Sequence, residues 1–508
     1  MLWFRVYGVE AEIVNSSPRS FLHQRGDFEG RWIVAWIRSA VWSIVIQLLF
    51  VCYGTIAFAE QRPPNILFIS IDDLNDWVGC LGGHPQSLTP NLDRLAKRGV
   101  LFTNAHCVAP ACNPSRSAVF AGRPPNQTGL YRNEQSLRGV MPDAVLLPDF
   151  LRRSGYWAAG SGKLLHYVID AQSWDEYFPA KETENPFPKH IPWGSRPKSL
   201  PRAGKWQYVE TDWHAFDVTD DEFGGDVLTA KYIARQLAKP HDRPFFLGCG
   251  IYRPHEPWFN PKQYFDQFPI ETIQLPPGYH PDDLSDLPAA GLRLGPNRYF
   301  DHIRRHGQWR EAVRAYLASI AFADANLGRV LDALEAGPNR DNTIVVLWSD
   351  HGWHLGEKQH WQKFTGWRAS TRVPLIISVP KDAPGLPEGT IAGSVCDQPV
   401  DLLGLFRTVS ELCGFSPPTH VQGQSLLPLL RDVKAQWPHL AYTFLGSPGS
   451  VAMSGLRHRY IRYANGDEEF YDIVDDPYEW HNVANDPDYV QELGEFRERL
   501  PESFVPIR

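Results

Sequence analysis

Two apolar segments of the sequence run directly into residues that can bind a cation. The segment NILFISI is followed by Asp72 and Asp73, and the segment TIVVLWS by Asp350 and His351. Ligands of open parallel sheets bind beyond the carboxyl ends of the strands, so two such strands would bring three carboxylates and an imidazole to one edge. Carboxylates repel each other unless a cation neutralises them, and oxygen-rich sites suit Ca²⁺, Mg²⁺ or Mn²⁺. Each pair alone could simply cap or turn after its strand, but both pairs together favour a metal site.

Basic side chains follow other predicted strands. The segment GSGKLLH contains Lys163 and His166, YRPHEPW contains His255, and HWQKF contains Lys363. A single lysine is usually solvated, and a single histidine usually has a structural partner. Because these residues follow separate strands, they can instead converge on one anion beside the metal.

Cys112 stands in the distinctive stretch CNPSRSAVFAGR. The chain has seven cysteines, too few and too scattered for a disulfide scaffold. Three interpretations are open: a disulfide with Cys107, a structural metal ligand, or a catalytic residue. A disulfide leaves Pro114, Arg116 and Arg123 of the same stretch unexplained. A structural zinc is also disfavoured, because no second Cys or His pair with zinc spacing lies nearby.

The composition is typical of a globular protein, and the net charge argues against nucleic acid as a partner. The 508 residues are 43% apolar and 21% charged, and the net charge is −8. This charge argues against a nucleic-acid binder with a globally basic surface. It also means that local basic groups must meet any anionic substrate.

The segment 40–59 (AVWSIVIQLLFVCYGTIAFA) has the features expected of an export signal. The segment is uncharged, follows Arg31 and Arg38, and ends in Ala57-Phe58-Ala59, a small-x-small pattern typical of signal-peptidase sites. We expect cleavage and export to a periplasmic, secreted or lysosome-like compartment. Twenty uncharged residues can also span a bilayer, so a retained membrane anchor is the alternative.

The rest of the chain alternates helices with apolar strands. Strands are predicted at 65–71, 343–349 and 373–379, and a helix at 312–335. Thr89 is predicted to cap a helix that has Pro90 in its first turn. This alternation predicts an α/β fold with a large, mainly parallel (mixed) sheet flanked by helices on both faces.

Two segments, 172–225 and 256–310, have weak periodicity and are predicted to be long insertions that build a binding cleft. After Pro438 the pattern changes to strands, with a hairpin signal at Asn465-Gly466. We therefore divide the chain into an N-terminal extension with the signal segment (1–59), a catalytic domain (60–437) and a smaller C-terminal α+β subdomain with an antiparallel sheet (438–508).

These motifs together resemble one family. The chain is similar to the type I sulfatases of the alkaline-phosphatase superfamily, and most similar to the iduronate-2-sulfatase-like branch. The resemblance runs from about residue 64 to about residue 485 and rests on NILFISIDD, TPNLDRLAKRGVLFTNAHC, CNPSRSAVFAGR, GSGKLLH, YRPHEPW, WSDHGWHLGEKQHWQKF, TRVPLII and EEFYDIVDDPYEWHNVA. The Cys-x-Pro-Ser-Arg motif with Gly-Arg at its end is its most specific part. It implies a sulfuric ester hydrolase that acts on a sulfated sugar or polysaccharide.

The resemblance implies that Cys112 is oxidised after translation to Cα-formylglycine. Pro114 and Arg116 would belong to the sequence read by the modifying partner, a formylglycine-generating or anaerobic sulfatase-maturating enzyme. One hydroxyl of the hydrated aldehyde would attack sulfur and expel the alcohol. The other would then lose its proton and expel sulfate, which restores the aldehyde.

The resemblance also implies a metal site. Its ligands would be Asp72, Asp73, Asp350 and His351, completed by the hydrated residue 112. Ca²⁺ is the expected cation and Mg²⁺ the alternative. The cation would polarise a sulfate oxygen and lower the pKa of the attacking hydroxyl.

The remaining catalytic roles are also carried over from the resemblance. Arg116 would hold the hydrate and offset its developing charge. Lys163 and Lys363 would bind sulfate oxygens. His255 would protonate the leaving alcohol, with His166 oriented toward the nucleophile or the sulfate.

One position departs from the family pattern. Four residues before RVP, where relatives commonly carry Glu or Asp, this chain has Arg368. The reversed charge indicates either a changed substrate contact or the loss of a local ion pair.

Two other functions fit parts of the pattern. A phosphonate monoester or phosphodiester hydrolase of the same superfamily would share the metal ligands, and a degenerate sulfatase would serve as a carbohydrate-binding protein. The segment RHRYIR places Arg457, Arg459 and Arg462 along a probable strand. We expect a solvated face there, with contact to a sulfated polysaccharide as the alternative.

Overall fold

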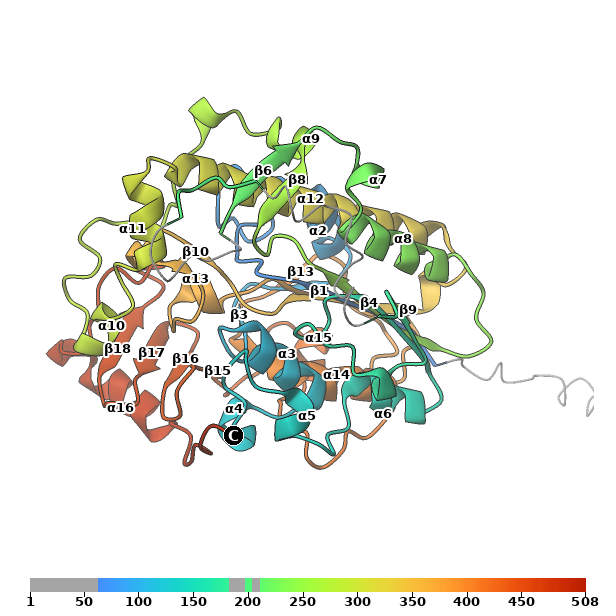
Figure 1. Ribbon diagram of the computed structural model, residues 1–508. Helices are drawn as coiled ribbons and strands as arrows, with labels where there is room; N and C mark the ends of the chain where they lie inside the picture. Colours follow the sequence, from blue (N-terminus) through green and yellow to red (C-terminus); the bar gives the residue numbers. More distant parts are fainter. Residues whose placement is uncertain (1–62, 182–196, 203–210) are drawn as a thin grey trace, which may run out of the picture. The chain divides into compact units, whose positions relative to one another are not determined.

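An eight-stranded sheet forms the centre of the protein in the computed structural model, which describes residues 63–181, 197–202 and 211–508 (Figure 1). Its strands lie in the order β13-β2-β12-β9-β1-β7-β4-β5. Their bounds are β1 (Asn65–Ile71), β2 (Val100–Phe102), β4 (Trp157–Gly162), β5 (Glu176–Phe178), β7 (Phe245–Ile251), β9 (Thr343–Ser349), β12 (Leu375–Ser378) and β13 (Ser394–Cys396).

Most neighbouring strands of this sheet run parallel. β1 pairs in parallel with both β9 and β7, and the parallel pairing continues from β7 through β4 to β5. β13 is parallel to β2, whereas β12 runs antiparallel to both β9 and β2. The sheet is therefore mixed and mainly parallel, which confirms the predicted fold class.

Helices cover both faces of the sheet (Figure 1). The helices α2 (Pro90–Ala96), α8 (Asp226–Leu237) and α12 (Trp309–Ala336) pack on one face, against Leu67 and Ile69 of β1. The helices α3 (Cys112–Ala121), α6 (Leu147–Arg153) and α14 (Leu405–Leu412) pack on the other face, against Ile66 and Phe68. Because both faces are covered, every residue of β1 and β9 is buried, and these strands read as continuous apolar runs.

The register of the central strands aligns their carboxyl ends. Ile71 at the end of β1 pairs with Ser349 on β9 and with Ile251 on β7. On the far side of β7, Gly162 at the end of β4 pairs with Gly250. The residues that follow these strands therefore leave the sheet at one edge, which is where the sequence places the predicted site.

Smaller elements connect the layers. In the described residues, three two-stranded sheets pair β3 (Ala105–His106) with β14 (Val400–Asp401), β6 (Trp213–Phe216) with β8 (Trp258–Pro261), and β10 (His354–Leu355) with β11 (Trp361–Gln362). The short helices are α4 (Pro125–Thr128), α5 (Leu137–Val140), α7 (Asp220–Phe223), α9 (Lys262–Phe265), α10 (Ala289–Leu292), α11 (Arg298–Arg305), α13 (Arg368–Thr371) and α15 (Leu427–Arg431). Parts of the predicted insertion at 172–225 lie outside the described residues.

An antiparallel sheet of four strands forms the C-terminal part of the chain, as predicted. Its strands are β15 (Ala441–Phe444), β16 (Val451–Ser454), β17 (His458–Arg462) and β18 (Glu468–Asp472), followed by α16 (Val490–Glu498). The turn between β17 and β18 contains Asn465 and Gly466, which confirms the hairpin. Phe444, Tyr460 and Phe470 belong to the same apolar cluster as the main sheet, so this part shares its core with the larger sheet.

The expectation of a solvated arginine face on β17 is wrong for Arg459, and so is the alternative of a polysaccharide contact there. Arg459 is fully buried and forms an ion pair with Glu479, 2.7 Å from Nε to Oε1. It also donates to Thr371 and Ser454. Arg457, by contrast, is half-exposed and pairs with Asp472.

The predicted signal segment, residues 40–59, lies outside the described residues. Among the described residues, no helix combines the length and the apolar character needed to cross a membrane.

Candidate active site

Cys112 is the first residue of α3. The preceding Ala111 is extended, and Gly122 ends the helix with a left-handed φ of 64°. A Cβ on Gly122 would lie 2.9 Å from the side chain of Val421, so both the conformation and the packing favour glycine there. The stretch CNPSRSAVFAGR is thus one helix and its end. The N–H groups and dipole of a helix N-terminus favour negative charge at residue 112.

Cys112 is a free thiol, and so is Cys107. The sulfur of Cys107 instead lies 3.8 Å from the carbonyl oxygen of Ser370. The disulfide interpretation is therefore wrong in this structure.

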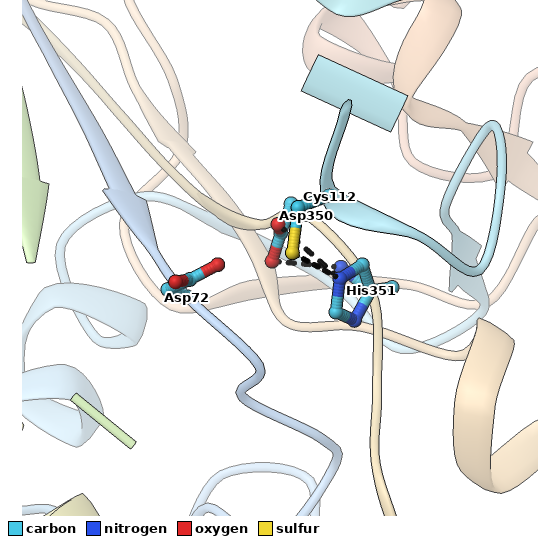
Figure 2. A group of neighbouring side chains, drawn as sticks. All are labelled: Asp72, Cys112, Asp350 and His351. Atoms are coloured by element: carbon cyan, nitrogen blue, oxygen red, sulfur yellow. Dashed lines mark hydrogen bonds and ion pairs between the residues drawn. The ribbon is translucent and has the colours of Figure 1, made fainter. Parts of the chain in front are cut away.

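A carboxylate and imidazole cluster surrounds Cys112. The ligand atoms of Asp72, Cys112, Asp350 and His351 lie within 4.8 Å of one another (Figure 2). Nδ1 of His351 is 3.0 Å from the carbonyl oxygen of Gly352, which can only accept. Nδ1 therefore carries the proton, and Nε2 can present its lone pair to the cluster. This donor set, drawn from the ends of β1 and β9 and the start of α3, fits a divalent cation.

Asp73 lies at the border between this cluster and His255. It also groups with Cys112 and His255 in a second set of converging ligand atoms. Its Oδ1 lies 3.5 Å from Nε2 of His351, and its backbone N–H donates to Oδ1 of Asp350 over 3.1 Å. Oδ2 of Asp73 is buried and accepts no hydrogen bond from the described residues, which fits a carboxylate oxygen available to a cation. The five predicted ligands thus lie together.

Arg116 lies under the carboxylates. Its Nε donates to Asp350 over 2.8 Å and its Nη2 to Asp72 over 2.9 Å, and all three side chains are fully buried. Nη1 donates to the carbonyl oxygen of Lys163 over 2.6 Å. In the described structure Arg116 makes these hydrogen bonds rather than one to Cys112. Its geometry is that of a positioning residue that holds two predicted metal ligands in place.

Two lysines from separate segments of the chain lie near the thiol. Nζ of Lys363 lies 3.1 Å from the Cys112 sulfur and 2.6 Å from Oδ1 of Asp73. Nζ of Lys163 lies 3.7 Å from the sulfur and pairs with Asp72. Lys163 follows the point where β4 and β7 approach closely. A Cβ on the preceding Gly162 would lie 2.0 Å from a β7 carbonyl oxygen, and its φ is 76°.

Two histidines border the same space. Nδ1 of His255 lies 2.5 Å from the carbonyl oxygen of Glu256, and its Nε2 lies 3.9 Å from Asp73. Burial would lower the pKa of His255, but the Asp73 carboxylate raises it to about 10. His166 lines a cavity together with Asn113, the residue after Cys112, and it contributes to lowering the pKa of the Cys112 thiol. Both predicted histidines therefore lie at the site.

The charges of the site favour an anion at residue 112. Burial alone would raise the pKa of the Cys112 thiol, but Lys163 and Lys363 hold this pKa well below its ordinary value. Burial would likewise raise the pKa of Asp72, and Lys163 and Arg116 lower it below its usual range. An anionic group attached to residue 112 would be stabilised by the same two lysines.

Two tyrosines, which the sequence analysis did not single out, complete the surroundings. The hydroxyls of Tyr167 and Tyr252 are 3.0 Å apart, and Nζ of Lys163 lies 4.8 Å and 5.1 Å from their ring centres. Tyr167 follows His166 directly, and Tyr252 stands at the start of the segment YRPHEPW. Their position beside known motif residues is the signal that could have identified them.

A cavity of about 600 Å³ is lined by residues that neighbour the site, although Cys112 itself does not line it. Its lining includes His166 and Tyr167, together with Asn113, the residue after Cys112. Arg138 also lines it and forms an ion pair with Asp170, 2.7 Å from Nε to Oδ1. This cavity has the volume expected of a pocket for a small organic group.

This arrangement suits the cleavage of an ester of a small oxyanion. The lysines match the negative oxygens of such a group, and residue 112 supplies a nucleophile between them. The mixed α/β fold and the site together define an ester hydrolase with a donor set that fits a divalent cation.

The chain belongs to the sulfatase family. Residues 64–415 match the family described as Sulfatase, and residues 356–504 match the family described as N-sulphoglucosamine sulphohydrolase, C-terminal. The protein is thus a sulfuric ester hydrolase of the alkaline-phosphatase-like superfamily, which confirms the resemblance found in the sequence.

Relatives agree with this assignment over most of the chain. A sulfatase of Formosa agariphila is 36% identical over 455 residues, which is 87% of this chain and 87% of the relative. The mouse iduronate 2-sulfatase is 31% identical over 397 residues, which is 70% of this chain and 69% of the relative.

Solved structures establish the same fold. A phosphonate monoester hydrolase of Agrobacterium radiobacter superposes with a TM-score of 0.70 at 23% identity and covers 86% of this chain and 94% of its own. A structure described as a 2-O GAG sulfatase gives a TM-score of 0.64 at 24% identity, with 86% of this chain and 91% of its own covered.

Proposed function

We propose that this sulfatase removes sulfate from a sulfated sugar or polysaccharide, with the residue formed from Cys112 as its nucleophile. The observation that carries this proposal is the position of the Cys112 sulfur, 3.1 Å from Nζ of Lys363 and 3.3 Å from Nε2 of His351. A formylglycine hydrate at this position would supply one hydroxyl to attack sulfur and a second to release sulfate.

Lys163 and Lys363 hold the sulfate group of the substrate. Lys163 pairs with Asp72, and Lys363 pairs with Asp73. Because the two ammonium groups are held by different carboxylates, they can bind different oxygens of one sulfate. Charge grows on these oxygens and on the leaving oxygen as the S–O bond breaks. Buried cations that are already in place stabilise that charge without reorganising.

His255 is assigned to the proton that the leaving alcohol needs. Its Nδ1 is held by the carbonyl oxygen of Glu256, so Nε2 is the nitrogen that faces the site. His166 lies on the side of the cavity that would hold the alcohol portion of the substrate. The imidazole of His255 is thus oriented to donate from a fixed position.

A divalent cation fits among Asp72, Asp73, Asp350 and His351, with residue 112 completing the set. When bound, it would polarise a sulfate oxygen and acidify the attacking hydroxyl. Ca²⁺ is our assignment because the donors are mainly carboxylate oxygens, and Mg²⁺ is the alternative. Arg116 keeps two of these carboxylates oriented.

The substrate is proposed to be a 2-O-sulfated hexuronate in a glycosaminoglycan-like polysaccharide. Two curated relatives point to this class: the mouse iduronate 2-sulfatase and, at 29% identity over 88% of this chain, a Delta 4,5-hexuronate-2-O-sulfatase of Bacteroides thetaiotaomicron. The cavity beside His166 and Asn113 would receive the sugar.

Export and maturation belong to the same proposal. The segment 40–59 would direct the chain out of the cytoplasm, and a formylglycine-generating or anaerobic sulfatase-maturating enzyme would convert Cys112.

Mass analysis of the tryptic peptide 99–116 tests the nucleophile. The peptide contains both Cys107 and Cys112, so unmodified protein takes up two alkyl groups after reduction. Conversion of Cys112 lowers the mass of the peptide by about 18 Da before alkylation and also removes one alkylation site, while Cys107 serves as the internal control. Fully active enzyme with both thiols alkylatable would contradict the mechanism.

Activity assays test the substrate class. Purified enzyme is expected to release sulfate from 2-O-sulfated uronate oligosaccharides faster than from glucosamine 6-O-sulfates. Phosphodiester and phosphonate monoester substrates, measured in parallel, distinguish sulfatase activity from the alternative activity of the same superfamily. A higher kcat/KM for either of them would overturn the proposed function.

A further inference from the structure

A second cavity has a volume of about 300 Å³. Its walls come from the loop after β1, which contributes Asp76 and Trp77, from the region of α13, which contributes Arg368 and Arg372, and from the segment that contains Glu479. The residues assigned above to the nucleophile, the metal and the sulfate do not line it. Arg368, the first residue of α13, is the cation of this wall that the inference concerns.

The guanidinium of Arg368 forms no direct ion pair with a carboxylate in the described structure, although Glu479 and Asp76 lie near enough to act on its charge. Its Nη1 donates to the carbonyl oxygen of Pro477 over 2.8 Å, and its buried Nε has no hydrogen-bond partner among the described residues. Glu479 accepts from the backbone N–H of Arg368, over 2.7 Å, and not from its guanidinium. A partly buried guanidinium without an anionic partner is costly, so an anion in the cavity would stabilise it.

The nearby carboxylates are already engaged by other cations. Asp76 pairs with Arg372, 2.8 Å from Oδ2 to Nη1, and Glu479 pairs with the buried Arg459. Glu357 also lines the cavity, and burial raises its pKa to about 7, which reduces its negative charge near neutral pH. Among the described residues, the guanidinium of Arg368 is therefore left without an ion-pair partner of its own.

The geometry points to a second anion site in this cavity, with Arg368 as its principal donor and a sulfate-like oxyanion as its ligand. A guanidinium binds sulfate, phosphate or carboxylate oxygens through two parallel N–H groups. A water occupies about 30 Å³, so the cavity has room for a tetrahedral oxyanion and several waters. The inference does not rest on the proposed substrate, because it uses only the charges and space around Arg368.

Two sources can supply this ligand. One is free inorganic sulfate, the product of the sulfatase reaction. The other is a second sulfate group on a polysaccharide whose first sulfate lies at Cys112. The chemistry of recognition is the same, and the experiments below distinguish the two sources.

Crystals of the full chain soaked in selenate locate the site directly. We expect an anomalous selenium peak beside Arg368, in addition to any peak beside Lys163 and Lys363. Selenium confined to the catalytic residues, or absent, would overturn the inference.

Calorimetric titration with sodium sulfate measures the same site in solution. Arg368→Gln is expected to weaken binding at this site by about tenfold or more, because a charge-assisted hydrogen bond is lost. Arg368→Lys keeps the charge and is expected to retain part of the binding, which guards against loss through misfolding. Arg305→Gln, which breaks an exposed ion pair with Asp301, is the matched control and should leave the titration unchanged. Identical titrations for wild type and Arg368→Gln would overturn the inference.

Kinetics then identify the source. If the ligand is a substrate sulfate, Arg368→Gln raises KM for a polysulfated substrate and leaves KM for an aryl sulfate unchanged. If it is free sulfate, the substitution changes inhibition by added sulfate with the aryl substrate instead. Either result supports the site, and neither depends on the sugar specificity proposed above.

Discussion

We predict that the buried ion pairs of Arg116 with Asp72 and Asp350 are needed for the stability of the site. The substitution Arg116→Met keeps a long side chain and removes the charge that joins Asp72 and Asp350, 2.9 Å and 2.8 Å away. All three side chains have no solvent exposure. Two buried carboxylates would then have lost their shared cation.

The expected cost is large because water cannot replace the guanidinium. Removing one partner of a buried ion pair costs about 3–5 kcal/mol, since it leaves an uncompensated charge. We therefore expect Arg116→Met to lower the free energy of unfolding by at least that amount, measured by urea denaturation without added divalent cation. Sulfatase activity should be lost as well, because two metal ligands are no longer oriented.

A matched substitution at an exposed arginine distinguishes the effect of breaking a buried ion pair from the effect of losing an arginine in general. Arg305→Met breaks the pair with Asp301, in which the arginine side chain is 74% exposed, and should cost less than about 1 kcal/mol. The double substitution Arg116→Met with Asp350→Asn should recover part of the stability, because it removes one of the unpaired carboxylates. If Arg116→Met costs no more than Arg305→Met, the assignment of Arg116 as a buried positioning residue is refuted.

Three further predictions concern the catalytic groups and a buried carboxylate. Lys363→Met should lower kcat by about 10²–10³-fold with intact folding by circular dichroism, as expected when one stabilising donor is lost. His255→Gln should reduce the rate for sugar sulfates by about 10²–10⁴-fold and the rate for nitrophenyl sulfate much less, because a nitrophenolate needs no proton to leave; equal losses would exclude His255 as the acid. Burial raises the pKa of Asp324 from 3.8 to about 6. The raised pKa of Asp324 should therefore contribute to the free energy of unfolding below pH 3.8, and this contribution should be lost as pH rises to about 6. Asp324→Asn should flatten this part of the plot of unfolding free energy against pH. An unchanged plot would contradict the shift.

The positions of the site residues could be predicted because local sequence fixes them. A fully buried parallel strand is recognisable as an apolar run, and the residues after it must lie at the carboxyl edge of the sheet. That reasoning placed Asp72 and Asp350 correctly, since Ile71 and Ser349 pair in register. It also placed Lys163 and His255 near them, because β4 and β7 continue the same parallel sheet.

Side-chain partners distant in sequence could not be predicted in this way. Thr89 has the position of a cap before α2, but its hydroxyl accepts from the N–H of Gly79 instead. The first N–H groups of α2 are met from α12, where Asp324 accepts from Leu92 over 2.8 Å. Arg459 likewise alternates along its strand like a solvated residue, yet it is fully buried because Glu479 from a later loop pairs with it. Each partner is set by packing between elements, which the local pattern does not contain.

The charges at the site also explain why a cation and a sulfate ester should bind together. Three buried carboxylates, on Asp72, Asp73 and Asp350, face three buried cations, on Arg116, Lys163 and Lys363. In this arrangement Lys163 pairs with Asp72, and Lys363 pairs with Asp73. When the charge of these carboxylates is met by a divalent cation, the two ammonium groups are left to neutralise sulfate oxygens. The lysines thus exchange one anionic partner for another, and the net charge of the buried site changes less when cation and substrate are both bound than when the cation binds alone. Binding of either one should therefore strengthen binding of the other, by the reciprocity that links two ligands through a shared set of charges.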